Sequence, residues 1–132
     1  MTDFRTLKLS WKPNQYLVTP AGWGPSRPHR ESPLFARDSA TVYAAIKAVA
    51  LDQPRVKLIS EDPKKGRMEL VQRTKIIRFP DFVSVEVVPV EGKGSTVLIY
   101  SRAKYGIRDF GVNRRRIDRW LALLGERLAK TP

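Results

Sequence analysis

The spacing of apolar residues changes along the chain, and its first regular stretch predicts a helix. Between residues 38 and 52 the apolar positions recur every three or four residues, at Val42, Tyr43, Ile46, Val49 and Ala50. This period is typical of a helix with one buried face. Asp38 or Ser39 can cap its start, and Gln53-Pro54 ends it, because the residue before a proline disfavours helical geometry.

After this helix the period shortens to two, which predicts strands. The segments 55–60, 67–77, 82–88 and 95–102 alternate or run apolar between turn signals. Asp62-Pro63 with Gly66, then Pro80-Asp81, and finally EGKG at 91–94 separate them. Links this short predict antiparallel neighbours in one sheet.

A second helical pattern closes the chain, from about residue 112 to residue 129. Its apolar stripe consists of Ile117, Trp120, Leu121, Leu124 and Leu128. The order of helix, four strands and helix predicts an α+β fold. We therefore expect a four-stranded antiparallel sheet with both helices packed on one face.

Residues 1–37 differ from the rest because prolines and glycines exclude a long helix there. The segment is nevertheless rich in large apolar residues, which disordered segments lack. These include Phe4, Leu7, Leu9, Trp11 and Trp23. We predict an ordered, irregular N-terminal arm over residues 1–37, with a short strand at 15–19. It would pack on an α+β domain of residues 38–132, so that the chain forms a single domain.

The charge balance is the unusual feature of the composition. The 132 residues include 25 Lys and Arg but 13 Asp and Glu, which gives a net charge of +12. Such a surplus attracts nucleic acid, anionic membrane surfaces and acidic proteins. Because basic residues occur in every part of the chain, a solvated basic surface explains the same number. A binding surface would draw on Lys104, Arg108, Arg114, Arg115 and Arg119.

The sequence has no cysteine, which excludes disulfides and thiol chemistry. Its first residues, MTDFRTLKLSWKPNQ, contain no apolar core of a secretory signal, and no apolar run is long enough to span a membrane. We therefore predict a cytoplasmic protein without a membrane span. The oligomeric state is left open by these features.

One segment concentrates the candidate chemistry, YGIRDFGVNRRRIDRW at residues 105–120. Gly106 and Gly111 allow a tight turn between the last strand and the last helix. Asp109 or Asn113 can cap that helix. The three arginines at 114–116 lie in its first turn, where the helix dipole disfavours cations.

Three interpretations of this segment stay open. Its polar residues could form a hydrogen-bonded network that holds the loop to the sheet. Alternatively, amides at the helix start could bind an anion together with arginines, or the arginines could form a basic surface. The ligand-binding hypothesis rests on Arg102, Tyr105, Asp109, Asn113, Arg116 and Tyr16.

Catalytic patterns are weak in this sequence. His29 is the only histidine, and Ser32, His29 and Asp38 lack the context of a catalytic triad. No glycine-rich phosphate loop and no paired metal ligands are present. We assign no catalytic residue, metal site or cofactor, and hydrolase or transferase activity through Asp109 and His29 stays open as a minor alternative. The favoured function is a non-enzymatic binding module for an anionic or amphipathic ligand, with nucleic-acid or acidic-surface binding and a structural or partner-protein role as alternatives.

The residues also resemble a known family, the domain of unknown function 1499, and its short bacterial members in particular. The segment SRAKYGIRDFGVNRRRIDRWLALL at 101–124 is similar to the family's closing signature. The signature positions are Ser101, Arg102, Gly106, Asp109, Gly111, Asn113 and Arg116. PNQYLVTPAG at 13–22, HRESPLF at 29–35 and LVQRTKIIRFPD at 70–81 resemble its other blocks. Many relatives carry two aspartates after the middle phenylalanine, whereas this chain has Asp81 alone. The resemblance implies a shared fold and supplies no reaction.

Overall fold

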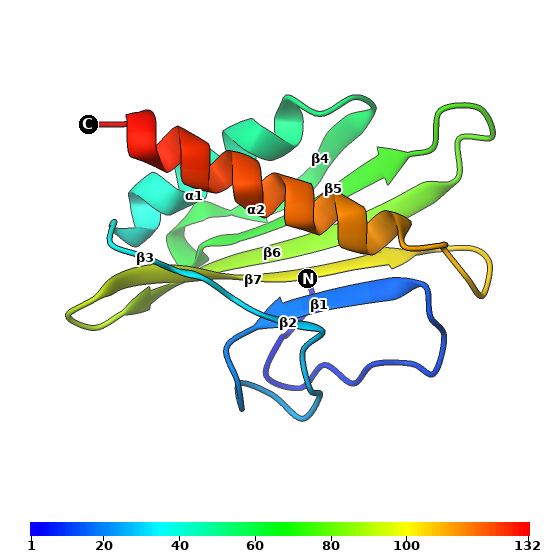
Figure 1. Cartoon of the computed structure of the whole chain (residues 1–132), viewed down its shortest axis with the longest axis horizontal. Helices are drawn as coiled ribbons and strands as arrows, with labels where there is room; N and C mark the ends of the chain where they lie inside the picture. Colours follow the sequence, from blue (N-terminus) through cyan, green and yellow to red (C-terminus); the bar gives the residue numbers. More distant parts are fainter.

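A computed structural model describes residues 1–132, and it has an α+β fold with one mixed sheet and two helices (Figure 1). The strands are β1 (Gln15–Thr19), β2 (Arg30–Glu31), β3 (Leu34–Phe35), β4 (Val56–Asp62), β5 (Arg67–Arg73), β6 (Pro80–Val90) and β7 (Gly94–Ala103). The helices are α1 (Ser39–Leu51), α2 (Val112–Lys130) and the short 3-10 turn η1 (Pro63–Lys65). Neither α1 nor α2 combines the length and the apolar character that crossing a bilayer requires.

The sheet has seven strands, so the prediction of a four-stranded antiparallel sheet is wrong in number and in pairing. The strand order is β2-β1-β7-β6-β5-β4, and β3 pairs with the other half of β7. The β4 to β7 meander is antiparallel as expected, while β1 and β2 pair in parallel. The difference arises because three short strands of the N-terminal arm join the sheet. β1 and β3 pair with β7, and β2 pairs with the outer edge of β1.

The boundary at the end of β5 is a second difference. The expected strand 67–77 ends at Arg73, and the next one begins at Pro80. Residues 74–79 form a closed turn, in which Thr74 N donates to the Phe79 carbonyl at 3.0 Å. Arg78 adopts a positive φ of 66°, which lies outside the extended region of a strand. The apolar and polar residues therefore alternate in the sequence beyond the point where the strand ends.

Both helices cover the same face of the sheet (Figure 1). The expected stripes of α1 and α2 pack into one core with the inward residues of β5, β6 and β7. Asp38 caps α1 by accepting a hydrogen bond from Thr41 N at 2.7 Å, as predicted. The two-residue period is confirmed in β6, where Val83, Val85 and Val87 all face this core.

The opposite face of the sheet has a smaller core that the N-terminal arm covers. Phe4 of the arm packs with Leu17, Val88 and Leu98 of the sheet. Arm residues 7, 9 and 23 border the same cluster. The ordered arm thus replaces a second layer of helices on part of this face.

One end of the sheet positions the candidate site. There β5 and β7 end, β4 and β6 begin, and α2 starts directly after the 104–111 loop. We call this the site end of the sheet. It lies at the right of Figure 1, where the β5–β6 loop and the β7–α2 loop both project.

Candidate functional site

A buried ion pair lies at the centre of the site end. Arg116 of α2 donates from Nη2 to Asp81 Oδ2 of β6 at 2.8 Å, and both side chains are more than nine-tenths buried. Arg116 also donates from Nε to the Gln72 side chain of β5. Since burial of a charge is costly without a partner, the pair is a structural clamp between α2 and two strands.

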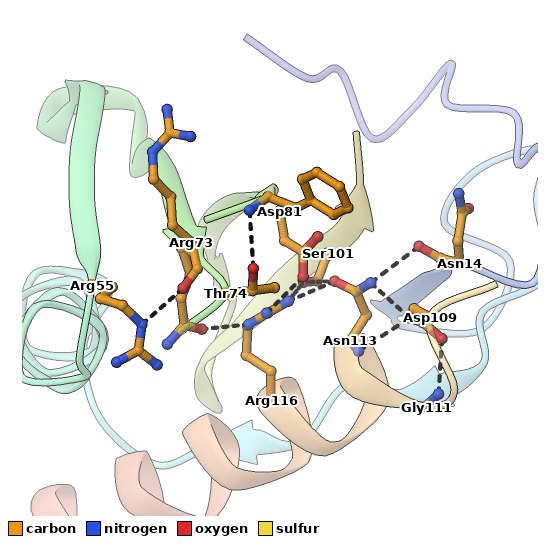
Figure 2. A network of polar contacts seen from close by, with 12 residues as sticks. Asn14, Arg55, Arg73, Thr74, Asp81, Ser101, Asp109, Gly111, Asn113 and Arg116 are labelled. Atoms are coloured by element: carbon orange, nitrogen blue, oxygen red, sulfur yellow. Dashed lines mark hydrogen bonds and ion pairs between the residues drawn. The ribbon is translucent and has the colours of Figure 1, made fainter. Parts of the chain in front are cut away.

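A second set of hydrogen bonds extends from Arg116 to β7 (Figure 2). The Asn113 side-chain oxygen accepts from Ser101 Oγ at 2.6 Å and from Arg116 Nη1 at 2.7 Å. Asn113 and Ser101 are both fully buried. Buried polar atoms need hydrogen-bond partners, and these residues act as hydrogen-bond partners for one another.

The loop before α2 completes the network. The Asp109 carboxylate accepts from the backbone nitrogens of Gly111 at 2.9 Å and Asn113 at 3.1 Å. It also accepts from Asn113 Nδ2 at 2.7 Å. Asn14 of the arm accepts from the same amide and donates to the Gly106 carbonyl at 2.8 Å. The amides at 111 and 113 are therefore used internally by Asp109, which leaves the arginines as the means of binding an anion here.

Arg102 lies on the other face of the sheet, away from this network. Neighbouring residues of a strand point to opposite faces, so Ser101 faces α2 while Arg102 faces the arm side. There Arg102 donates to Ser84 Oγ at 2.6 Å and lies over the ring of Tyr100. Burial lowers the pKa of its guanidinium. The predicted grouping of Arg102 with Asp109, Asn113 and Arg116 is therefore wrong.

Tyr16 and Asp109 meet in a separate hollow of about 420 Å³, which Pro13, Gln15, His29, Gly111 and Arg114 also line. The Tyr16 hydroxyl donates to Asp118 Oδ1 at 3.0 Å. Burial, and then this hydrogen bond, raises the pKa of Tyr16. The Tyr16 ring stacks on His29 at 5.6 Å between centroids. Tyr105, by contrast, lies exposed on the β7–α2 loop.

His29 should make the stability of the fold depend on pH. Its Nδ1 accepts from Leu17 N at 2.9 Å, and burial lowers its pKa. The stabilisation by neutral His29 is therefore present above the unfolded pKa of about 6.5 and is lost as the pH falls through the lower folded pKa. We expect the thermal midpoint to fall between about pH 7 and pH 5, and His29→Asn to flatten this fall. If the thermal midpoint fell equally in the native protein and in His29→Asn, the pH dependence would come from other titratable groups.

A strongly basic pocket of about 500 Å³ lies between α2, the end of β5 and the α1–β4 connection. Six cationic side chains line it, and the lining contains no carboxylate. They are Arg55, Arg73, Lys75, Arg115, Arg116 and Arg119. Gln53, Pro54, Gln72, Thr74, Val112 and Trp120 complete the wall. We call this the basic pocket.

Several of these cations are held in place by backbone carbonyls. Arg55 Nε donates to the Arg73 carbonyl at 2.9 Å (Figure 2), and Arg73 Nη1 donates to the Arg78 carbonyl at 3.0 Å. Arg115 Nη1 donates to the Phe110 carbonyl at 2.9 Å. A guanidinium has five N–H donors, so each of these side chains keeps donors free. Fixed guanidinium groups can bind an anion with less loss of conformational entropy.

The structure distributes the predicted basic surface over several places. Arg115 and Arg119 line the basic pocket. Arg114 faces Asp118, 3.7 Å away, one turn along α2. Lys104 lies over the rings of Phe82 and Tyr105, on the loop that also carries exposed Arg108. Of the six predicted ligand residues, Arg116 alone belongs to the basic pocket.

Several residues of the site had no local signal in the sequence. Asp81, Gln72 and Asn14 are joined to α2 through contacts between positions far apart in the chain. Arg55 directly precedes β4 and Arg73 is the last residue of β5, so the two cations meet because β4 pairs with β5. Ser101 was named as a position of the closing signature, and the alternation along 95–102 also places its side chain on the sheet face opposite to that of Arg102.

The sequence model of one protein family, described as protein of unknown function (DUF1499), matches residues 10–124. The chain belongs to this family. The match covers the arm strands, the meander and most of α2, and it includes every residue of the buried network. Searches of curated proteins and of solved structures find no match to the chain.

Proposed function

We propose that this DUF1499 protein is a non-enzymatic binding module whose basic pocket takes a small phosphate-bearing anion. The observation that carries the proposal is the lining of six cations without a carboxylate. Like charges gathered in one hollow repel one another, and an anion relieves that repulsion. Guanidinium groups also match phosphate through paired hydrogen bonds.

Five of the six cations are available for a ligand. Asp81 neutralises Arg116, whereas the other five form no ion pair in the structure. The pocket wall offers Val112 and Trp120 as its apolar part, which is small beside its basic part. This composition favours a compact, highly charged ligand over an amphipathic one.

Binding is favoured over catalysis by the side chains in the wall. The side chains that most often act as general bases are histidine and carboxylates, and the lining has neither. The Thr74 hydroxyl is already the acceptor for Phe79 N at 2.9 Å. We therefore assign the pocket to recognition of an anion rather than to its conversion.

Isothermal titration calorimetry with inorganic pyrophosphate tests the proposal, alongside native mass spectrometry for a copurifying anion. Pyrophosphate should bind the native protein, and Arg55→Ala with Arg119→Ala should weaken binding by at least about tenfold, because each charge-assisted hydrogen bond contributes about 1.5–3 kcal/mol. Both residues are exposed, so the variant should stay folded.

The matched control removes two cations from the opposite end of the sheet, with Lys64→Ala and Lys93→Ala. It carries the same net charge as the pocket variant and should bind pyrophosphate like the native protein. Equal loss in both variants would mean that net charge alone attracts the anion. Absence of binding by the native protein, together with a clean apo mass, would contradict the proposal directly.

A further inference from the structure

Six large apolar side chains stand exposed on two loops at the site end. Their exposed fractions run from 48% at Phe79 to 87% at Ile76. The set is Ile76, Ile77 and Phe79 of the β5–β6 loop, with Tyr105, Ile107 and Phe110 of the β7–α2 loop. We call residues 75–79 and 104–110 the loop edge. Exposed apolar residues are ordinary singly, but a cluster on neighbouring loops indicates an interaction surface.

The two loops form one surface. Lys104 N donates to the Pro80 carbonyl at 3.2 Å, which joins the base of one loop to the other. The rings of Phe79 and Tyr105 lie 5.9 Å apart between centroids. Within the first loop, hydrogen bonds between Thr74 and Phe79 close the turn and leave Ile76 and Ile77 at its tip. Both loops project beyond the sheet at the same end (Figure 1).

Cations alternate with the apolar side chains along this surface. The two segments read KIIRF and KYGIRDF, so Arg78 and Arg108 stand between apolar residues, and Lys75 and Lys104 directly precede them. The one carboxylate is Asp109, which is bound to the amides at the start of α2. The outer surface of the loop edge is therefore both apolar and positively charged.

We propose that the loop edge docks on an anionic lipid bilayer, with Ile76, Ile77 and Phe110 in the interfacial layer. Apolar side chains at projecting tips gain from leaving water for the lipid boundary. Lys and Arg beside them keep their charged ends among anionic headgroups. A nucleic acid would use the cations but leave the aliphatic tips in water, so it fits this surface less well.

This proposal goes beyond the anion pocket and does not depend on it. The loop edge and the basic pocket share Lys75, but the apolar tips are separate from the cations that would hold a small anion. The two proposals therefore respond to different substitutions. Loss of the aliphatic tips should leave pyrophosphate binding unchanged, and loss of Arg55 and Arg119 leaves the tips in place.

Cosedimentation with vesicles tests the docking. The full chain should partition onto phosphatidylcholine vesicles that contain about one third phosphatidylserine, and much less onto phosphatidylcholine alone. Ile76→Ser with Ile77→Ser should lower the partition coefficient by at least about tenfold, since two aliphatic side chains no longer leave water. The matched control is Leu51→Ser with Ile59→Ser, two exposed aliphatic residues away from the loop edge, which should bind like the native protein.

Four results would overturn the proposal. In the first, the native chain does not cosediment with anionic vesicles. In the second, the Ile76 and Ile77 variant binds them as well as the native chain does. Binding of a single-stranded RNA without vesicle binding would make the surface a nucleic-acid interface. Size-exclusion chromatography adds the fourth result, since a dimer that the isoleucine variant dissociates would assign the loop edge to contact between copies of the chain.

Discussion

Replacing Arg116 by alanine should destabilise the fold by about 3–5 kcal/mol, because a buried charge would lose its partner. Asp81 is 5% exposed, and Arg116 is its one side-chain hydrogen-bond partner. The same substitution removes hydrogen bonds to Gln72 and Asn113. Urea denaturation followed by circular dichroism measures the loss directly.

Arg114→Ala is the matched control for this variant, since Arg114 lies in the same first turn of α2. Its side chain is 73% exposed and faces Asp118 across one helical turn. Exposed pairs of this kind contribute little, so we expect a change within about 0.5 kcal/mol. A similar small change for Arg116→Ala would show that the buried pair does not stabilise the protein. In Asp81→Leu combined with Arg116→Met much of the loss should be recovered, because neither charge is then left unpaired.

The segment 101–124 contains residues with two different roles, one in stability and one in the basic pocket. Asp109, Asn113, Ser101 and Arg116 satisfy one another inside the protein, so they hold the β7–α2 loop and the start of α2 against the sheet. Arg115 and Arg119 lie on α2 beside them and face the basic pocket. The network therefore fixes the direction from which the pocket arginines project. Variants of the network test folding, and variants of the pocket test binding.

The sequence predicted the elements well where a single period ran for a long stretch. Both helices and the β4 to β7 meander follow from their spacing, and the Asp38 cap follows from residue type. The two-residue strands β2 and β3 are too short to show alternation, so their pairing could not be predicted. β1 was expected as a strand, yet its partner β7 lies more than 80 residues later.

The site was less predictable than the fold because its parts come from distant segments. Because Arg102 and Asn113 are close in the sequence, they were expected in one site. The alternation of side chains along β7 instead places the Arg102 side chain on the opposite face of the sheet. The acidic partner of Arg116 lies on another strand, where a lone aspartate after proline gives no signal of burial. The basic pocket combines the start of β4, the end of β5 and the start of α2, which strand pairing and the packing of α2 on the sheet bring together.

Replacing Trp120 by alanine should cost about 3–5 kcal/mol, because it removes the largest fully buried side chain of the core. Trp120 is 1% exposed and packs in the cluster that both helices share with the sheet. The cavity would lie beneath the basic pocket, whose wall Trp120 also forms. Urea denaturation measures the loss, and a higher pyrophosphate dissociation constant should accompany it if α2 shifts.

Trp11→Ala is the control for the same change at an exposed position. Its side chain is 76% exposed, so its removal should alter the free energy of unfolding by no more than about 0.5 kcal/mol. If both tryptophan variants lost the same stability, the common cause would lie in the unfolded chain rather than in the core. A large loss confined to Trp120 would show instead that the apolar packing of α2 on the sheet stabilises the fold. The buried network would then hold the start of α2 against the sheet, and the core would hold the rest of the helix.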